Sequence, residues 1–246
     1  MDESGGKEST SSQREYYCQF VTDQESAVLP EFDQKTEAEI VADMKRPDHF
    51  NVYGAMDPGF SDYTGYVTGY YDFLKAAYVV ENEAWLKQAT TPEVARTIME
   101  CDSIWGARPV KLRVSDTDPR IIADMATMHG IHFVPTAKDN LDAQVNAVRT
   151  LIKQRRLFIN PRCVNLIRQC KTAIWNESRT TWEKTKNDGH FDLLAALIYW
   201  VRNVNKYDNP YPDPLSNACT DDMFISPMRE KPEANNAKAL RRAFNG

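Results

Sequence analysis

Hydrophobic and polar positions alternate in two rhythms along the chain, and the first rhythm predicts strands. Residues 51–57 (NVYGAMD) form a short apolar run that ends on an acid and is broken at once by Pro58-Gly59. Residues 65–73 (GYVTGYYDF) and 75–85 (KAAYVVENEAW) are rich in β-branched and aromatic residues and are separated by breaks. We therefore expect three consecutive antiparallel strands.

From residue 91 onwards the pattern predicts alternating helices and strands. Thr91-Pro92-Glu93 combines a cap residue, a proline and a first-turn acid, so a helix should run to about Ser103. Residues 109–116 (PVKLRVSD) alternate apolar and basic side chains, as a strand does. The remaining predicted elements are a helix from Asp118-Pro119 to a stop at Gly130, a strand at 131–136, a helix at 141–155 capped by Asn140, a brief strand at 157–159, a helix from Pro161 to about Trp175, and a helix at 189–207 capped by Asp188.

This order of elements predicts an α/β fold whose central sheet mixes antiparallel and parallel pairing. Residues 1–14 are too polar to offset the entropy of ordering, and we expect a disordered leader there. Residues 208–246 contain five prolines and a basic stub, KALRRAF, which is typical of an extended tail. The folded domain should therefore comprise residues 15–207.

Composition narrows the class of protein. A chain of 246 residues with 42% hydrophobic residues can bury a sizeable core. Its longest apolar run, residues 193–201, is far shorter than the roughly 20 residues of a membrane helix, and the polar N-terminus is no secretory signal. Five cysteines without a CxxC pair argue against a disulfide framework or a thiolate zinc site. We expect a soluble protein of a reducing compartment.

Charge is unevenly distributed. The net charge of -5 argues against non-specific coating of nucleic acid. Residues 149–186, however, hold ten basic residues against two acidic ones. A polyanion could meet one basic face of the molecule, or this window could be a solvated helical surface.

Three aspartates carry the candidate chemistry. Asp57 and Asp116 end predicted strands, and Asp192 heads an otherwise apolar helix of small residues. Ligand sites in open α/β sheets gather beyond the carboxyl ends of strands. Crowded carboxylates need divalent cations, and oxygen ligands favour Mg²⁺ or Mn²⁺; two such ions about 4 Å apart suit phosphodiester hydrolysis. Each acid could instead be an ordinary turn former or helix cap.

Several segments together resemble a known family. They are REYYCQFVTDQESAVLPEF, YGAMDPGFSDYTGYVTGYY, AYVVENEAW, VSDTDPRIIADMATMHGIHFVPT and GHFDLLAALIYWVRN. Over roughly residues 15–206 the chain resembles the C-terminal nuclease domain of the large terminase subunit of tailed bacteriophages. The resemblance implies a ribonuclease H-like fold, a central mixed sheet with helices on both faces. It also implies a Mg²⁺- or Mn²⁺-dependent endonuclease that uses two ions to cut concatemeric viral DNA during packaging.

The resemblance also implies roles for individual residues. Asp57 matches the first metal-binding acid, which typically bridges both ions, and Asp192 matches the acid that heads the final helix. For the second acid we favour Asp116 over Asp118, because Asp116 lies nearer the strand; Asp118 would then cap the helix behind Pro119.

Weaker candidates flank these acids. Asp62 is either a metal ligand acting through water or a plain turn residue. His190 could assist a metal-bound water or contact phosphate. Alternatively, it only fixes the start of the helix. Glu81 is a weaker candidate for the site than Asp62 or His190.

The implied partners are double-stranded DNA, an ATPase motor, the small terminase subunit and the portal protein, in the cytoplasm of the infected host. Phosphate contacts are expected from the basic window, at Arg155, Arg156, Lys184 and Lys186, and Trp182 either steers DNA or packs on the sheet.

Two departures from the family qualify this interpretation. The sequence lacks the GxxxxGK[ST] loop of the family's motor, so any packaging motion must come from another polypeptide. Ala196 and Ile198 stand where many relatives have an acid and an arginine, which affects the register of Asp192. The alternatives are a catalytically inactive docking module for portal or capsid, and another ribonuclease H-like nuclease such as a junction resolvase.

Overall fold

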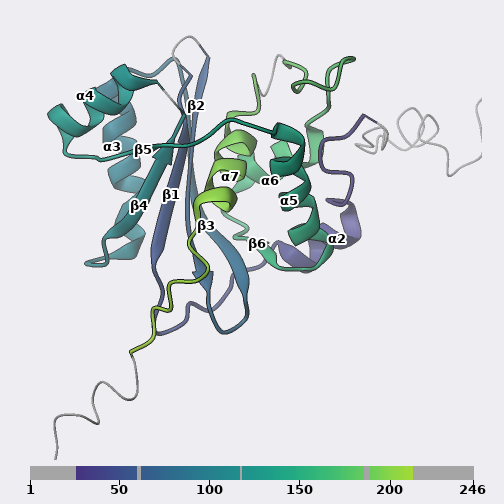
Figure 1. Ribbon diagram of the computed structural model, residues 1–246, viewed down its shortest axis with the longest axis horizontal. Helices are drawn as coiled ribbons and strands as arrows, with labels where there is room; N and C mark the ends of the chain where they lie inside the picture. The colour runs from purple at the N-terminus through teal and green to yellow at the C-terminus, as the bar shows by residue number, and fades with distance from the viewer. Residues whose placement is uncertain (1–25, 60–61, 117, 186–188, 213–246) are drawn as a thin grey trace, which may run out of the picture. The chain divides into compact units, whose positions relative to one another are not determined.

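A mixed six-stranded sheet forms the centre of the computed structural model, which describes residues 26–59, 62–116, 118–185 and 189–212. The strand order is β5-β4-β1-β2-β3-β6 (Figure 1). β1, β2 and β3 pair antiparallel, whereas β4, β5 and β6 join in parallel. The predicted mixed pairing is therefore confirmed. The strands are β1 (Val52–Asp57), β2 (Tyr63–Asp72), β3 (Ala77–Lys87), β4 (Val110–Ser115), β5 (Val134–Pro135) and β6 (Leu157–Ile159).

Helices cover both faces of the sheet, as predicted (Figure 1). One face carries α3 (Thr91–Asp102) and α4 (Pro119–His129). The other face carries α7 (Asp192–Asn203), which lies against β1 and β2 at the centre of the sheet. Outside α7 lie α2 (Gln34–Ile40), α5 (Leu141–Lys153) and α6 (Val164–Thr172).

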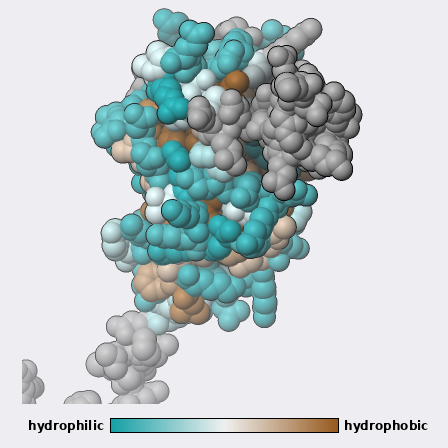
Figure 2. Space-filling view, turned by 90° about the vertical axis from the view of Figure 1, so that its right-hand side faces the viewer, coloured by the Kyte–Doolittle hydropathy of each residue, from teal (hydrophilic) through white to brown (hydrophobic). Residues whose placement is uncertain are grey.

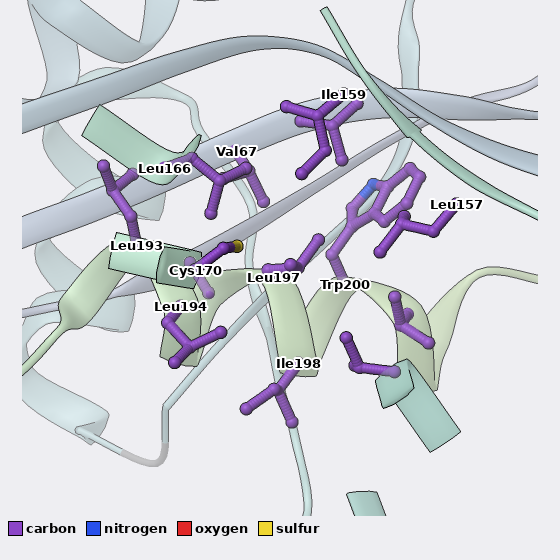
Figure 3. Close-up of a cluster of buried hydrophobic side chains, with 14 of the residues drawn as sticks. Val67, Leu157, Ile159, Leu166, Cys170, Leu193, Leu194, Leu197, Ile198 and Trp200 are labelled. Carbon is purple, nitrogen blue, oxygen red and sulfur yellow. The ribbon is translucent and has the colours of Figure 1, made fainter. Parts of the chain in front are cut away.

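The main hydrophobic core surrounds α7. All residues from 192 to 201 are buried, because sheet residues cover one side of the helix and α5 and α6 cover the other. Figure 3 shows Leu193, Leu197 and Trp200 of α7 among side chains of the sheet and of α6. The Trp200 indole Nε1 donates a hydrogen bond to the Tyr53 carbonyl at 3.0 Å, which anchors the helix to β1.

Several boundaries differ from the sequence-based prediction. The final helix begins at Asp192 rather than 189, because Gly189 and Phe191 both adopt left-handed backbone angles. The helix expected from Pro161 begins at Val164. α2 was not predicted; the Asp33 carboxylate caps it by accepting a hydrogen bond from the Thr36 backbone N–H at 2.7 Å.

Part of the prediction falls outside the described residues. The leader 1–14 and the proposed cap Asp188 lie there, as does most of the tail. The described residues from 26 to 210 belong to one compact unit, and residues 211 and 212 belong to a second. No helix in the described part is long and apolar enough to cross a membrane. The molecular face in Figure 2 is mainly hydrophilic.

Candidate active site

Asp57 and Asp116 lie at the same edge of the sheet. Asp57 is the last residue of β1, and Asp116 directly follows β4. In the parallel pairing of these strands, Met56 lies beside Ser115, and the Asp116 backbone N–H donates to the Met56 carbonyl at 3.4 Å. Parallel strands expose their carboxyl ends at one edge, so the two acids that follow this pair are neighbours.

Asp192 reaches the same edge because Gly65 has no side chain. Gly65 lies directly opposite Asp57 in the β1–β2 pairing. A Cβ atom on Gly65 would lie 2.6 Å from the carbonyl carbon and oxygen of Asp192 and 2.7 Å from the backbone nitrogen of Leu193. Only glycine allows the first turn of α7 to rest directly on β2. The three acids that sequence reasoning singled out therefore lie at the same edge of the sheet.

A glutamine from another helix fixes the start of α7. Phe191, the N-cap residue, adopts φ 60° and makes no side-chain cap. The Gln169 side-chain oxygen instead accepts hydrogen bonds from the backbone N–H groups of Leu193 at 3.0 Å and Leu194 at 3.1 Å. Gln169 belongs to α6 and is fully buried. It is a positioning residue for Asp192, and sequence reasoning missed it because no local pattern marks a cap supplied from another helix.

The start of α6 is held in the same way. Its N-cap residue, Cys163, makes no side-chain cap. The Glu83 carboxylate of β3 accepts hydrogen bonds from the backbone N–H groups of Asn165 at 2.9 Å and Leu166 at 2.7 Å. The sheet therefore positions α6, and α6 positions the acid end of α7.

Burial and repulsion by neighbouring acids raise the pKa values of Asp57 and Asp192, which we call the inner acids. The pKa of Asp57 is raised to about 7, mainly by burial and then by the negative charges of Asp192 and Asp116. The Lys138 ammonium and the Tyr199 hydroxyl lower it, but by less. Burial and the charge of Asp62 raise the pKa of Asp192 to about 7 as well. The charges of Asp116 and Asp192 therefore act on Asp57, and the charge of Asp62 acts on Asp192.

Two lysines form ion pairs with the outer acids, Asp116 and Asp62. Lys138 forms an ion pair with Asp116, and Lys184 forms one with Asp62 at 2.5 Å. The His190 Nε2 atom also lies 3.6 Å from the Asp62 carboxylate. The predicted auxiliary residues Asp62 and His190 therefore lie beside Asp192.

The chemical type of these side chains suits a divalent cation, although their spacing in this structure does not yet form a metal site. All the converging side chains offer carboxylate oxygens, which hard cations prefer. The buried Oδ2 atom of Asp192 has no hydrogen-bond partner in the described part of the chain. The described residues nevertheless contain no group of three or more His, Cys, Asp or Glu side chains gathered closely enough to hold a metal ion. The outer acids, Asp116 and Asp62, are engaged by their lysines, and like charges favour separation until a cation neutralises them.

Comparisons with known proteins identify the fold. A comparison of the sequence with protein-family models finds no match, and neither does one with curated proteins. Among solved structures, the P22 large terminase nuclease domain aligns with a TM-score of 0.58 at 16% identity, over 72% of this chain and 92% of that one. The large terminase nuclease from thermophilic phage G20c, with bound magnesium, aligns with a TM-score of 0.52 at 13% identity, over 73% and 98%.

The chain has the terminase nuclease fold. The predicted ribonuclease H-like architecture is therefore confirmed. A large terminase from a thermophilic bacteriophage also aligns, with a TM-score of 0.59 at 18% identity over 73% of this chain. The chain spans 45% of the length of that protein.

Within this terminase nuclease fold, the two candidates for the second acid have different surroundings. The Asp118 carboxylate caps α4 and accepts hydrogen bonds from the backbone N–H groups of Arg120 at 3.0 Å and Ile121 at 3.4 Å. Asp116 is the one that borders Asp57. The lower-ranked Glu81 forms an ion pair with Arg46 at 3.2 Å.

The basic residues predicted to contact DNA are divided between the two ends of the sheet. Arg155 pairs with Glu39, and the Arg156 Nε atom donates to the Ala76 carbonyl at 2.7 Å. Both precede β6, which pairs with the start of β3, whereas the acids lie at the level of the end of β3. Of the predicted residues that the structure describes, Lys184 is the one that lies beside the acids. Lys186 lies outside the described residues, and Trp182 packs against Trp175 with ring centroids 6.0 Å apart.

The raised pKa values predict that the metal-free protein becomes less stable as pH rises. Asp57 and Asp192 keep their protons up to about pH 7 when folded, but lose them near their ordinary value of 3.8 when unfolded. Between these limits the folded state binds more protons, so the free energy of unfolding falls as pH rises through this window. Urea unfolding in chelator at about pH 5 and about pH 8 measures this fall.

Variants separate the contribution of the site from that of other buried acids. Asp57→Asn combined with Asp192→Asn should flatten the decrease, and Asp142→Asn, in the exposed first turn of α5, should leave it as in the wild type. Equal decreases in the wild type and the double variant would contradict the raised pKa values.

Proposed function

We propose that this protein is a Mg²⁺- or Mn²⁺-dependent DNA endonuclease that cuts concatemeric viral DNA during genome packaging. The observation that carries the proposal is the convergence of Asp57, Asp116 and Asp192 at the carboxyl edge of a terminase nuclease sheet. Asp192 contributes a buried oxygen without a hydrogen-bond partner in the described part of the chain. The magnesium in the G20c nuclease supports the same class of cofactor.

Asp57, Asp116 and Asp192 would hold the ions, and Asp62 is a further candidate ligand. Two such ions, when bound, lower the pKa of an attacking water and stabilise the leaving oxygen of a phosphodiester. Asp57 and Asp192 must lose their protons to bind cations, so the affinity of the metal-free protein for Mn²⁺ should increase as pH rises through about 7.

Two neighbouring side chains have supporting roles in this proposal. The Tyr199 hydroxyl of α7 lies near the Asp57 carboxylate and favours its charged form, which opposes the rise in its pKa. The exposed His190 imidazole is placed to hold a proton or contact phosphate beside Asp62. Arg155 and Arg156 are left out of the proposed DNA path because they lie at the other end of the sheet.

The wider setting is also part of the proposal. The chain spans 45% of the large terminase with which it aligns, and we propose that an ATPase motor, a small terminase subunit and a portal protein cooperate with this nuclease in the host cytoplasm.

A cleavage assay tests the proposed function. The purified protein should nick and linearise supercoiled plasmid with Mn²⁺ or Mg²⁺, and chelator should abolish cutting. Branched DNA and RNA–DNA hybrids serve as competitors. A strong preference for either would favour a different ribonuclease H-like nuclease, and inactivity with both metals over a range of concentrations would favour a docking module.

A further inference from the structure

Four side chains form a stack of rings and cations on the sheet. The Tyr63 ring of β2 and the Trp85 ring of β3 stack with centroids 4.2 Å apart and planes 10° apart. The Lys87 ammonium lies 5.3 Å from the centre of the Tyr63 ring, and the Arg168 guanidinium of α6 lies 5.0 Å from the centre of the Trp85 ring. We call Tyr63, Trp85, Lys87 and Arg168 the cation–aromatic stack.

The cation–aromatic stack borders the acids. Trp85 lies opposite Gly65, which lies opposite Asp57, so these residues form one row across three strands. Directly opposed residues share a face of a sheet, which here is the face covered by α7. The loop that leads into α7 also touches the stack, because a Cβ atom on Gly189 would lie 2.8 Å from the Tyr63 ring.

The charge of Lys87 is available to an incoming anion. The other two lysines at this edge, Lys138 and Lys184, form ion pairs with acids. Lys87 is exposed, and its ammonium has no carboxylate partner anywhere in the described ranges. On the other ring, Arg168 donates to the Asn165 side chain at 3.0 Å, which fixes the direction of its guanidinium.

We infer that the cation–aromatic stack binds the DNA backbone beside the acids, with Lys87 and Arg168 contacting phosphates. The rings hold the two cations in place through cation–π attraction, so less side-chain entropy is lost when DNA binds. Because the rings cover one another and each carries a cation, phosphate contacts are expected rather than base stacking. This inference rests on the proposed function, for which it supplies the path of the substrate.

Fluorescence anisotropy with a labelled DNA duplex tests the inference. In chelator, where no cutting occurs, Lys87→Gln and Arg168→Gln should each weaken binding about three- to tenfold near 0.1 M salt. Each should also lower the slope of log affinity against log salt by about 0.9, as expected for one lost phosphate contact.

Matched controls occupy the other end of the sheet. Lys75 lies in the turn at the far end of the β2–β3 hairpin and pairs with Asp72 at 3.6 Å, so Lys75→Gln should leave affinity and salt slope unchanged. Arg155→Gln is the corresponding arginine control. Melting temperatures confirm that each variant is folded.

A double-mutant cycle tests the role of the rings. Trp85→Leu should weaken binding mainly when Arg168 is present, so the effects of Trp85→Leu and Arg168→Gln should be less than additive. If the wild type binds and cuts DNA while Lys87→Gln and Arg168→Gln keep its affinity and salt slope, the inference is overturned and the proposed function stands. If the wild type neither binds nor cuts DNA, both are overturned.

Discussion

Asp57→Asn is expected to reduce metal-dependent cleavage by at least about a thousandfold, because the charge stabilisation supplied by bound ions is worth several kcal/mol and each 1.4 kcal/mol is a factor of about ten. The amide has the same size as the carboxylate but cannot supply a charged oxygen to either ion. The charges of both Asp116 and Asp192 act on Asp57, which places it between the two other acids. Neither neighbour is therefore expected to take its place. Time courses of plasmid nicking with Mn²⁺ measure the loss.

The same substitution should not unfold the protein. Burial and neighbouring acids disfavour the charged form of Asp57, so its removal should leave the metal-free protein at least as stable near pH 8. Asp118→Asn is the matched control: it alters the cap of α4 at a cost of at most about 1 kcal/mol and should keep cutting. A nearly active Asp57→Asn variant would remove Asp57 from the site, and an inactive, folded Asp118→Asn variant would reopen the choice between Asp116 and Asp118.

Gly65→Ala is expected to lower cleavage by about a hundredfold in protein that remains folded. The new methyl group would lie 2.6 Å from the Asp192 carbonyl, so the first turn of α7 must move away from β2. A displacement of about 1 Å at a catalytic group can cost about a hundredfold in rate. The overpacking itself should lower the free energy of unfolding by about 1–3 kcal/mol.

Gly69→Ala separates the two effects. Gly69 lies on the same strand, and its Cβ atom would lie 2.1 Å from the Val79 carbonyl oxygen and 2.9 Å from the Trp200 ring, so it meets α7 about two turns beyond Asp192 and only through a side chain. Gly69→Ala should therefore lose stability while its folded fraction cuts at nearly the wild-type rate. Urea unfolding gives the folded fraction, and initial cleavage rates are compared at equal folded concentration. Equal specific rates for Gly65→Ala and the wild type would show that α7 does not depend on this close approach.

Much of the architecture follows from local patterns in the sequence. The apolar runs around residues 52–57, 63–72 and 77–87 define the three antiparallel strands because β-branched and aromatic side chains alternate there. Asp118-Pro119 and Gly130 define both ends of α4 by capping. Asp57 and Asp116 could be placed at one edge from the sequence, since each directly ends a predicted strand.

The sequence by itself determined these elements, the acids that end them and the apolar character of α7, because each depends on side chains only a few residues apart. The tertiary structure decided what depends on distant residues: that Gly65 admits Asp192 beside Asp57, that Gln169 caps α7, and that Lys138 and Lys184 pair with the outer acids. It also decided where the basic residues of the window lie. In the sequence, Arg155 and Arg156 belong to the basic window between Asp116 and Asp192. In the structure they lie at the opposite end of the sheet from the acids, because β6 pairs with the start of β3. Spatial proximity of residues far apart in sequence arises from packing and strand register, which no local window of a single sequence encodes.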